Sequence, residues 1–112
     1  MGAPRMTSPV LKVIAALLAD PDGEHYGLEL MHETGLPSGT LYPILMRLDR
    51  AGWVTSRWEQ LDPVVEGRPS RRYYRLTAQG AAAGRAEVEA MRATMARAFG
   101  PAAAARPADG TA

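Results

Sequence analysis

The 112-residue sequence contains no cysteine. This absence excludes a disulfide framework and a thiolate metal site, and nothing else points to an oxidising compartment. No apolar run approaches the roughly 20 residues that a membrane-spanning helix needs, and no signal-peptide pattern opens the chain. We therefore expect a cytoplasmic protein that has no membrane partner.

The motifs of common catalytic sites are missing as well. The chain has no phosphate-binding glycine loop, no His-Glu-x-x-His motif and no serine in a nucleophile-elbow context. His25, Glu29 and His32 recur at helical spacing, and these residue types can bind zinc or nickel. Because no fourth ligand is evident, we interpret the three as a solvated polar helix face. We predict a non-enzymatic protein with no metal site and no cofactor.

The charges are segregated along the chain, although the net charge is only +1. Residues 20–33 contain five acids and no Lys or Arg, whereas residues 68–75 contain four arginines and no acid. Such segregation most often marks a solvated surface, so by itself it is weak evidence for a nucleic-acid partner. A hydrophobic content of 46% is sufficient for the core of one small domain.

Residues 36–53 predict a short helix with two different faces. Its apolar residues recur at helical spacing and form a core-facing stripe: Leu41, Ile44, Leu45 and Leu48. The opposite face carries cations, a hydroxyl and a phenol, and it could enter a DNA groove: Gly39, Thr40, Tyr42, Pro43, Met46, Arg47 and Arg50. Ser38 is the predicted N-cap, and Gly52 suits the left-handed position that closes a helix.

Two further helices are expected before this one. Apolar spacing predicts a first helix over residues 7–19, capped by Thr7 or Ser8, and a second helix from about His25 to Thr34. A helix, a tight turn and another helix with a polar outer face is the order of a helix-turn-helix unit.

Two extended segments follow the helices. Residues 53–58 and 71–76 are rich in aromatic and alternating residues, and the turn residues between them predict a hairpin with a long, mobile tip. A helix-turn-helix followed by a basic hairpin is a winged helix. The alternative is a small α+β domain whose hairpin merely covers the core.

A final helix is predicted over residues 78–99, capped by Thr77. From Gly84 onward its apolar residues form a narrow seam that needs a partner, and we interpret the seam as a dimer interface: Val88, Met91, Met95 and Phe99. The first helix is the alternative partner. We expect residues 1–6 and 100–112 to be disordered, and residues 7–77 to form the DNA-binding domain.

Two strings in this sequence carry a specific resemblance to one family. HYGLELMHETGLPSGTLYPILMRLDRAGWVTSRWE, followed by GRPSRRYYRLTAQG, resembles the PadR family of transcriptional regulators over residues 10–80. The resemblance implies a mainly α fold with a small β-hairpin, a winged helix-turn-helix with a C-terminal dimerisation helix. It also implies a homodimer that represses transcription and is often released from DNA by a small effector. The short terminal helix looks like the subfamily that lacks a large C-terminal domain.

The resemblance also implies a set of DNA-binding positions. It places recognition on the third helix and the wing: Ser38, Gly39, Thr40, Tyr42, Pro43, Arg71 and Arg72. Arg47 and Arg50 lie further along the helix, within reach of bases or phosphates, and Arg68 belongs to the same basic cluster. Successive strand residues face opposite sides, so we expect Arg71 or Arg72 to lie in the loop.

Two alternative functions remain at this point, a MarR-type regulator and a winged-helix module that binds protein. An acidic outer face on the third helix would favour the protein-binding module, and this face is basic. The effector-binding tryptophans that some relatives carry in the terminal helix are missing, so the ligand does not transfer. We interpret Trp53 as a core residue rather than a ligand platform.

Overall fold

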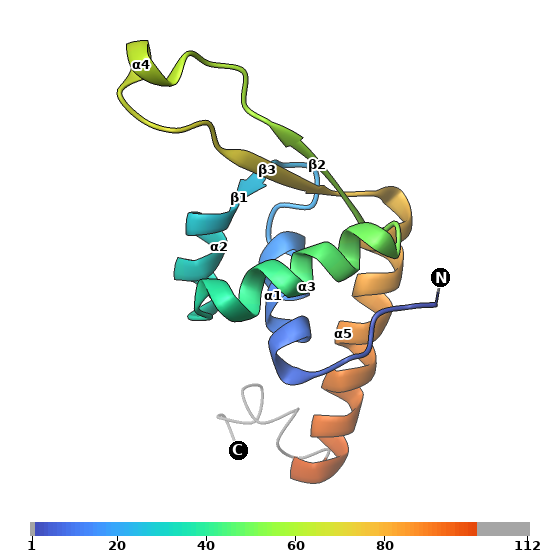
Figure 1. The fold of residues 1–112 in the computed structure, drawn as a ribbon. Coiled ribbons are helices and arrows are strands. Elements are labelled where there is room, and N and C mark those ends of the chain that lie inside the picture. Colours follow the sequence, from blue (N-terminus) through green and yellow to red (C-terminus); the bar gives the residue numbers. More distant parts are fainter. Residues whose placement is uncertain (1, 101–112) are drawn as a thin grey trace, which may run out of the picture.

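The computed structural model describes residues 2–100, in which the helices form the body and a small sheet lies along one side of it (Figure 1). The elements are α1 (Ser8–Leu18), β1 (His25–Tyr26), α2 (Gly27–Thr34), α3 (Ser38–Arg50), β2 (Val54–Trp58), α4 (Pro63–Glu66), β3 (Arg72–Leu76) and α5 (Ala78–Phe99). This arrangement confirms the mainly α winged-helix prediction. Of the predicted disordered tail, residues 100–112, all but Gly100 lie outside the described part.

Two helices begin at the caps that the sequence predicts. The Val10 amide lies 3.4 Å from the Thr7 hydroxyl at the start of α1, and the Gly80 amide donates to the Thr77 hydroxyl at 2.9 Å at the start of α5. Each hydroxyl accepts from a backbone donor that has no partner inside its helix.

The start of α3 differs from the prediction. Pro37 is the capping residue, and Ser38 is the first residue of the helix, so the predicted Ser38 cap is wrong. The physical reason is that Pro37 is extended and its carbonyl accepts from the Leu41 amide at 2.9 Å, which begins the helix one residue earlier. At the other end, Gly52 has a φ of 79°, the left-handed conformation expected of it.

The second helix is shorter than predicted because its first two residues belong to a strand. His25 and Tyr26 form β1 and pair antiparallel with Tyr74 and Tyr73 of β3, so α2 begins only at Gly27. The sheet therefore has three strands in the order β1-β3-β2, rather than the two of a simple hairpin. The pairing joins residues almost fifty positions apart, and no local pattern predicts it.

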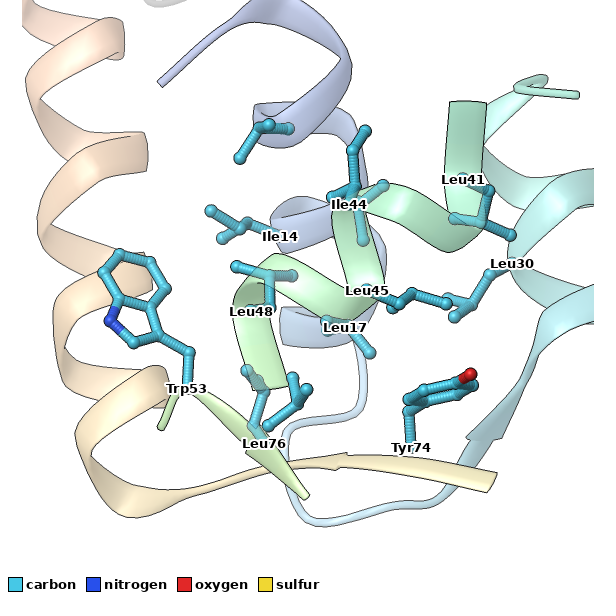
Figure 2. Packing of buried hydrophobic residues seen from close by; sticks show 13 residues of the cluster. Ile14, Leu17, Leu30, Leu41, Ile44, Leu45, Leu48, Trp53, Tyr74 and Leu76 are labelled. Carbon is cyan, nitrogen blue, oxygen red and sulfur yellow. The ribbon is translucent and has the colours of Figure 1, made fainter. Parts of the chain in front are cut away.

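The core lies between α1, α2, α3 and the sheet (Figure 2). The predicted stripe of α3 is fully buried there, since Leu41, Ile44, Leu45 and Leu48 are at most 2% exposed. Burying each such side chain contributes about 1.5–3 kcal/mol to the stability of the fold. Trp53 is 3% exposed, which confirms its interpretation as a core residue.

The connector between β2 and β3 extends away from the body as an arm (Figure 1). The short helix α4 forms its tip, where the predictions had only a mobile loop. The Asp62 carboxylate caps α4 by accepting from the Val64 amide at 3.0 Å, and Gly67 ends it at a φ of 72°.

The seam of α5 is divided between two environments. At its start, Gly84 packs so closely on α1 that a Cβ there would lie 3.0 Å from the Ile14 side chain, and Val88 packs against the core. This part of the seam is therefore covered by α1, the alternative partner. The exposed fractions then rise along the helix: Met91 41%, Met95 50% and Phe99 69%.

Among residues 2–100, no helix combines the length and the apolar character that crossing a bilayer requires.

Candidate nucleic-acid interface

The outer face of α3 is accessible over nearly its whole length. Among the predicted recognition residues on α3, only Thr40 is half-buried. The others are exposed: Ser38, Gly39, Tyr42, Pro43, Arg47 and Arg50. No acidic residue occupies the first turn. The first amide groups of a helix have no partner inside it and carry a partial positive charge, so this end of α3 suits a phosphate oxygen.

A cleft of about 850 Å³ separates α3 from the wing. One wall is formed by the outer face of α3 and the start of α2, and the other by β2, β3 and the base of the arm. Its main side chains are aromatic or cationic: Tyr26, Tyr42, Arg50, Trp58, Arg71 and Arg72. The cleft brings Tyr42, Met46 and Arg50 of the predicted helix face together with the predicted wing arginines. The other predicted residues of α3 do not line it: Ser38, Gly39, Thr40, Pro43 and Arg47.

Tyr42 reaches across this surface to α2. A Cβ on Gly27 would come within 1.9 Å of the Tyr42 hydroxyl oxygen, so the absence of a side chain at Gly27 makes room for the phenol. Tyr42 itself remains 39% exposed, which identifies it as a surface tyrosine rather than a core one.

The two wing arginines stack on aromatic rings. The Arg71 guanidinium lies 4.5 Å from the centroid of the Tyr26 ring, and the Arg72 guanidinium lies 5.4 Å from that of Trp58. Arg71 precedes β3 and Arg72 is its first residue, which confirms that one of them lies outside the regular strand. Both line the cleft. Cation–π contacts of this kind hold a guanidinium in place without neutralising its charge.

Arg72 is also connected to α3 through a serine that the sequence analysis did not identify. The Ser56 hydroxyl accepts from Arg72 Nε at 3.2 Å and Nη2 at 2.8 Å, and it lies 3.4 Å from Asp49 Oδ2, to which it donates. This chain of contacts ties the wing to the end of α3. No local signal marks Ser56, because its two partners come from two other elements, α3 and β3.

In space, carboxylates pair with one arginine of the acid-free cluster at residues 68–75 and with one arginine of β2. Glu59 pairs with Arg68 at 2.6 Å, and Glu24 pairs with Arg57 at 2.6 Å. Hydrogen bonds, from Arg68 above all, lower the pKa of Glu59 to about 2. Over residues 2–100, neither Arg71 nor Arg72 forms such a pair. Arg75 is likewise outside these pairs, but of the three only Arg71 and Arg72 bring their positive charge to the cleft.

The predicted polar face of His25, Glu29 and His32 does not form as expected. His25 is 5% exposed, and its Nε2 lies 2.9 Å from the Asp20 carbonyl oxygen, so it is a buried structural residue of β1. His32 is exposed on α2. Within the described range, no group of three or more His, Asp or Glu side chains is placed to hold a metal ion.

Comparisons with known proteins place the chain among regulators. A family model described as the transcriptional regulator PadR-like family matches residues 14–86. No curated protein matches the chain.

Solved structures share its fold. A PadR family transcriptional regulator from Eggerthella lenta is 28% identical, with a TM-score of 0.58 over 78% of this chain and 76% of that chain. A PadR-like transcription factor from Bacteroides fragilis is 23% identical, with a TM-score of 0.63 over 80% and 84%. AbfR of Staphylococcus epidermidis is 24% identical, with a TM-score of 0.64 over 84% of this chain and 58% of that chain.

Proposed function

Because this chain belongs to the PadR-like family of transcriptional regulators, we propose that it represses transcription by binding an inverted-repeat operator as a homodimer. The family consists of regulators rather than enzymes, which agrees with the lack of catalytic motifs. We expect the protein to act in the cytoplasm, because such an operator would be there.

One observation carries the proposal: Tyr42 and Arg50 on the exposed face of α3 border the same cleft as the wing arginines Arg71 and Arg72. The major groove of DNA admits one α-helix, whose first residues reach the base edges. With α3 in that position, Tyr42 and its neighbours read bases, while Arg71 and Arg72 reach the phosphates beside the groove. Arg47 and Arg50 supply further contacts along the helix.

The exposed end of α5 supports the dimer. Met91, Met95 and Phe99 follow one another at helical spacing, and the rest of the described chain leaves them open. A second copy of α5 would cover them by the same contacts on both sides, which gives a twofold axis. Two recognition helices related in this way read inverted half-sites about one helical turn, roughly 34 Å, apart.

A gel-shift titration with the DNA immediately upstream of the chain's own gene tests the proposal. We expect a saturable complex that survives excess nonspecific competitor and weakens steeply as the salt concentration rises. The matched control is the same duplex with one half-site scrambled, which should bind much more weakly. Equal affinity for both duplexes would contradict the dimeric operator complex.

A further inference from the structure

We propose that the arm is a self-recognition element through which two copies of this chain pair reciprocally. The tip of one copy, the short helix α4, binds in the cleft of the second copy, whose own tip binds in the cleft of the first. This arm pairing does not depend on the proposed function. Only its consequence for operator DNA rests on that function.

The first support is the distribution of exposed apolar surface. Within residues 2–100, the large apolar side chains that stay exposed fall into three groups. One lies at the end of α5, which the proposed dimer covers: Met91, Met95 and Phe99. The second lines the cleft: Leu28, Tyr42, Met46 and Trp58. The third is the tip of the arm, where Val64 is 89% exposed and Val65 is 75% exposed. Clustered apolar residues of this kind mark contact surfaces, whereas singly scattered ones have no such meaning.

The tip of the arm has the wrong charge for DNA. Asp62 and Glu66 flank the two valines, and residues 60–67 contain no Lys or Arg. A phosphate backbone repels carboxylates in this position. The partner that fits the tip is therefore a protein surface that combines exposed apolar side chains with positive charge.

The cleft has this character. Its charged side chains are Asp49, which the Ser56 hydroxyl approaches at 3.4 Å, and four arginines: Arg50, Arg68, Arg71 and Arg72. Trp58 and Met46, which are more than half exposed, provide the apolar surface beside them. Opposite charges around matched apolar groups favour one docked arrangement over others. The cleft of a second copy can therefore take both the valines and the carboxylates of the tip.

The end of α5 is the alternative apolar surface, and it fits the tip less well. Beside Met91 and Met95, the charge of Arg92 is balanced by Glu89 at 2.6 Å. In the part of the chain that the structure describes, Arg71 and Arg72 have no such ion pair. The cleft thus offers the carboxylates of the tip a stronger attraction.

The shape of the arm explains why the partner is a second copy. Figure 1 shows α4 at the far end of the arm, directed away from the body, whereas the cleft lies at the base of the arm. A tip therefore does not reach its own cleft. Two arms that lie antiparallel about a twofold axis place each tip at the base of the other arm. The two contacts are then identical and close the pair.

Arm pairing would cover side chains that the operator needs. Tyr42, Arg71 and Arg72 all line the cleft, so a docked tip and DNA exclude one another. The arm-paired form is then a DNA-free reserve, and operator DNA opens it by binding the unpaired form.

Cross-linking between two single-cysteine variants tests the pairing, because the native chain contains no cysteine. One full-length variant carries Val65→Cys at the tip, the other carries Met46→Cys in the cleft, and a short bismaleimide joins thiols that lie close together. We expect a mixed product, with the joined peptides identified by mass spectrometry. Arg97→Cys in place of Met46→Cys is the control, because it presents an exposed thiol at the end of α5.

Three outcomes of this experiment would overturn the pairing. The first is a tip-to-cleft yield no higher than that of the control. The second is a preferred product with Arg97→Cys, which would place the tip on α5. The third uses a chain that carries both Val65→Cys and Met46→Cys. Reciprocal contacts should stop at a doubly linked pair, so a ladder of larger products would contradict them.

Charge reversal provides a second, independent measurement. Val65→Arg with Glu66→Arg reverses the tip, and Arg71→Glu with Arg72→Glu reverses the cleft. Each variant alone should raise the Kd of arm pairing by about tenfold or more, because like charges then face one another. Mixing the two variants restores opposite charges at both contacts and should recover most of the association. A mixture that associates no better than either variant alone overturns the pairing.

Sedimentation velocity over rising protein concentration measures this association, and melting curves show that each variant is folded. The exposed end of α5 is the same in every variant, so the differences report the arms. Operator duplex should suppress the tip-to-cleft cross-link. A cross-link that persists beside saturating operator overturns the competition with DNA, whereas failure of the operator gel shift alone concerns the proposed function and leaves the cross-link result standing.

Discussion

The Glu59 carboxylate holds the Arg68 guanidinium through two hydrogen bonds, of 2.6 and 3.1 Å, across the base of the arm. The same carboxylate accepts from the Arg71 amide and the Tyr73 hydroxyl, both at 3.3 Å. Glu59 directly follows β2, and its side chain thus joins the two strands of the wing where they leave the sheet. Because it accepts from the Arg71 amide, it also holds the backbone from which the Arg71 side chain enters the cleft.

Glu59→Gln should loosen the arm and leave the body intact. A neutral amide cannot reproduce the paired, charge-assisted bonds to Arg68, so the α4 tip should become more accessible to protease. Limited proteolysis, with the cleavage sites read by mass spectrometry, measures this. Glu66→Gln is the control because Glu66 is exposed on α4 itself. Identical cleavage of both variants would show that Glu59 does not order the arm.

Acid should produce the same loosening over a defined pH range. The pKa of Glu59 is lowered from its ordinary value of 4.5 to about 2, so its contribution to the folded wing is complete above 4.5. This contribution declines as the pH falls below 4.5 and is lost as it falls through about 2. The measurement is the protection of the arm amides against hydrogen exchange, corrected for the pH dependence of intrinsic exchange. In the native chain this protection should fall over the range given, whereas in Glu59→Gln it should not change over that range.

Removing the two wing arginines should lower the affinity for every DNA sequence and reduce the salt dependence of binding. Each phosphate contact adds about 0.9 to the slope of log K against log salt concentration, so Arg71→Ala with Arg72→Ala should lower the slope by about 2. Arg68→Ala should change it less, because Glu59 balances that charge. An unchanged slope for the double variant would remove the wing from the interface.

Tyr42→Ala should reduce specific binding by roughly 1–3 kcal/mol while nonspecific binding stays nearly constant. Since Tyr42 is 39% exposed, the melting temperature without DNA should change little. Tyr42→Phe separates the ring from the hydroxyl. A large drop in melting temperature, or an equal loss on operator and random duplex, would contradict a role in base recognition.

Met91→Glu with Met95→Glu should produce monomers. The two carboxylates would be buried in an apolar contact without partners, at a cost that the dimer cannot sustain. Sedimentation measures the mass, and gel shift should show much weaker binding of a full operator. Met91→Leu is the control because it keeps the volume and apolar character. A dimer that persists with undiminished affinity would place the interface elsewhere, with α1 as the alternative.

The sequence by itself determined those parts of the protein that depend on local spacing. The apolar stripe of α3, the Thr7 and Thr77 caps and the left-handed Gly52 all follow from residues within a few positions of one another. The family could also be predicted from the sequence alone, because its two motif strings are each contiguous and lie at a defined separation.

Only the tertiary structure decided which distant residues meet. It paired His25 with Tyr74, brought Glu59 to Arg68, placed Tyr42 over Gly27 and gave the start of the α5 seam to α1. The pairing with β3 overrode the helical pattern at His25, and a carboxylate nine residues away neutralised one arginine of a cluster that looks acid-free. These outcomes depend on side chains from separate elements packing together, and local periodicity carries no record of that packing.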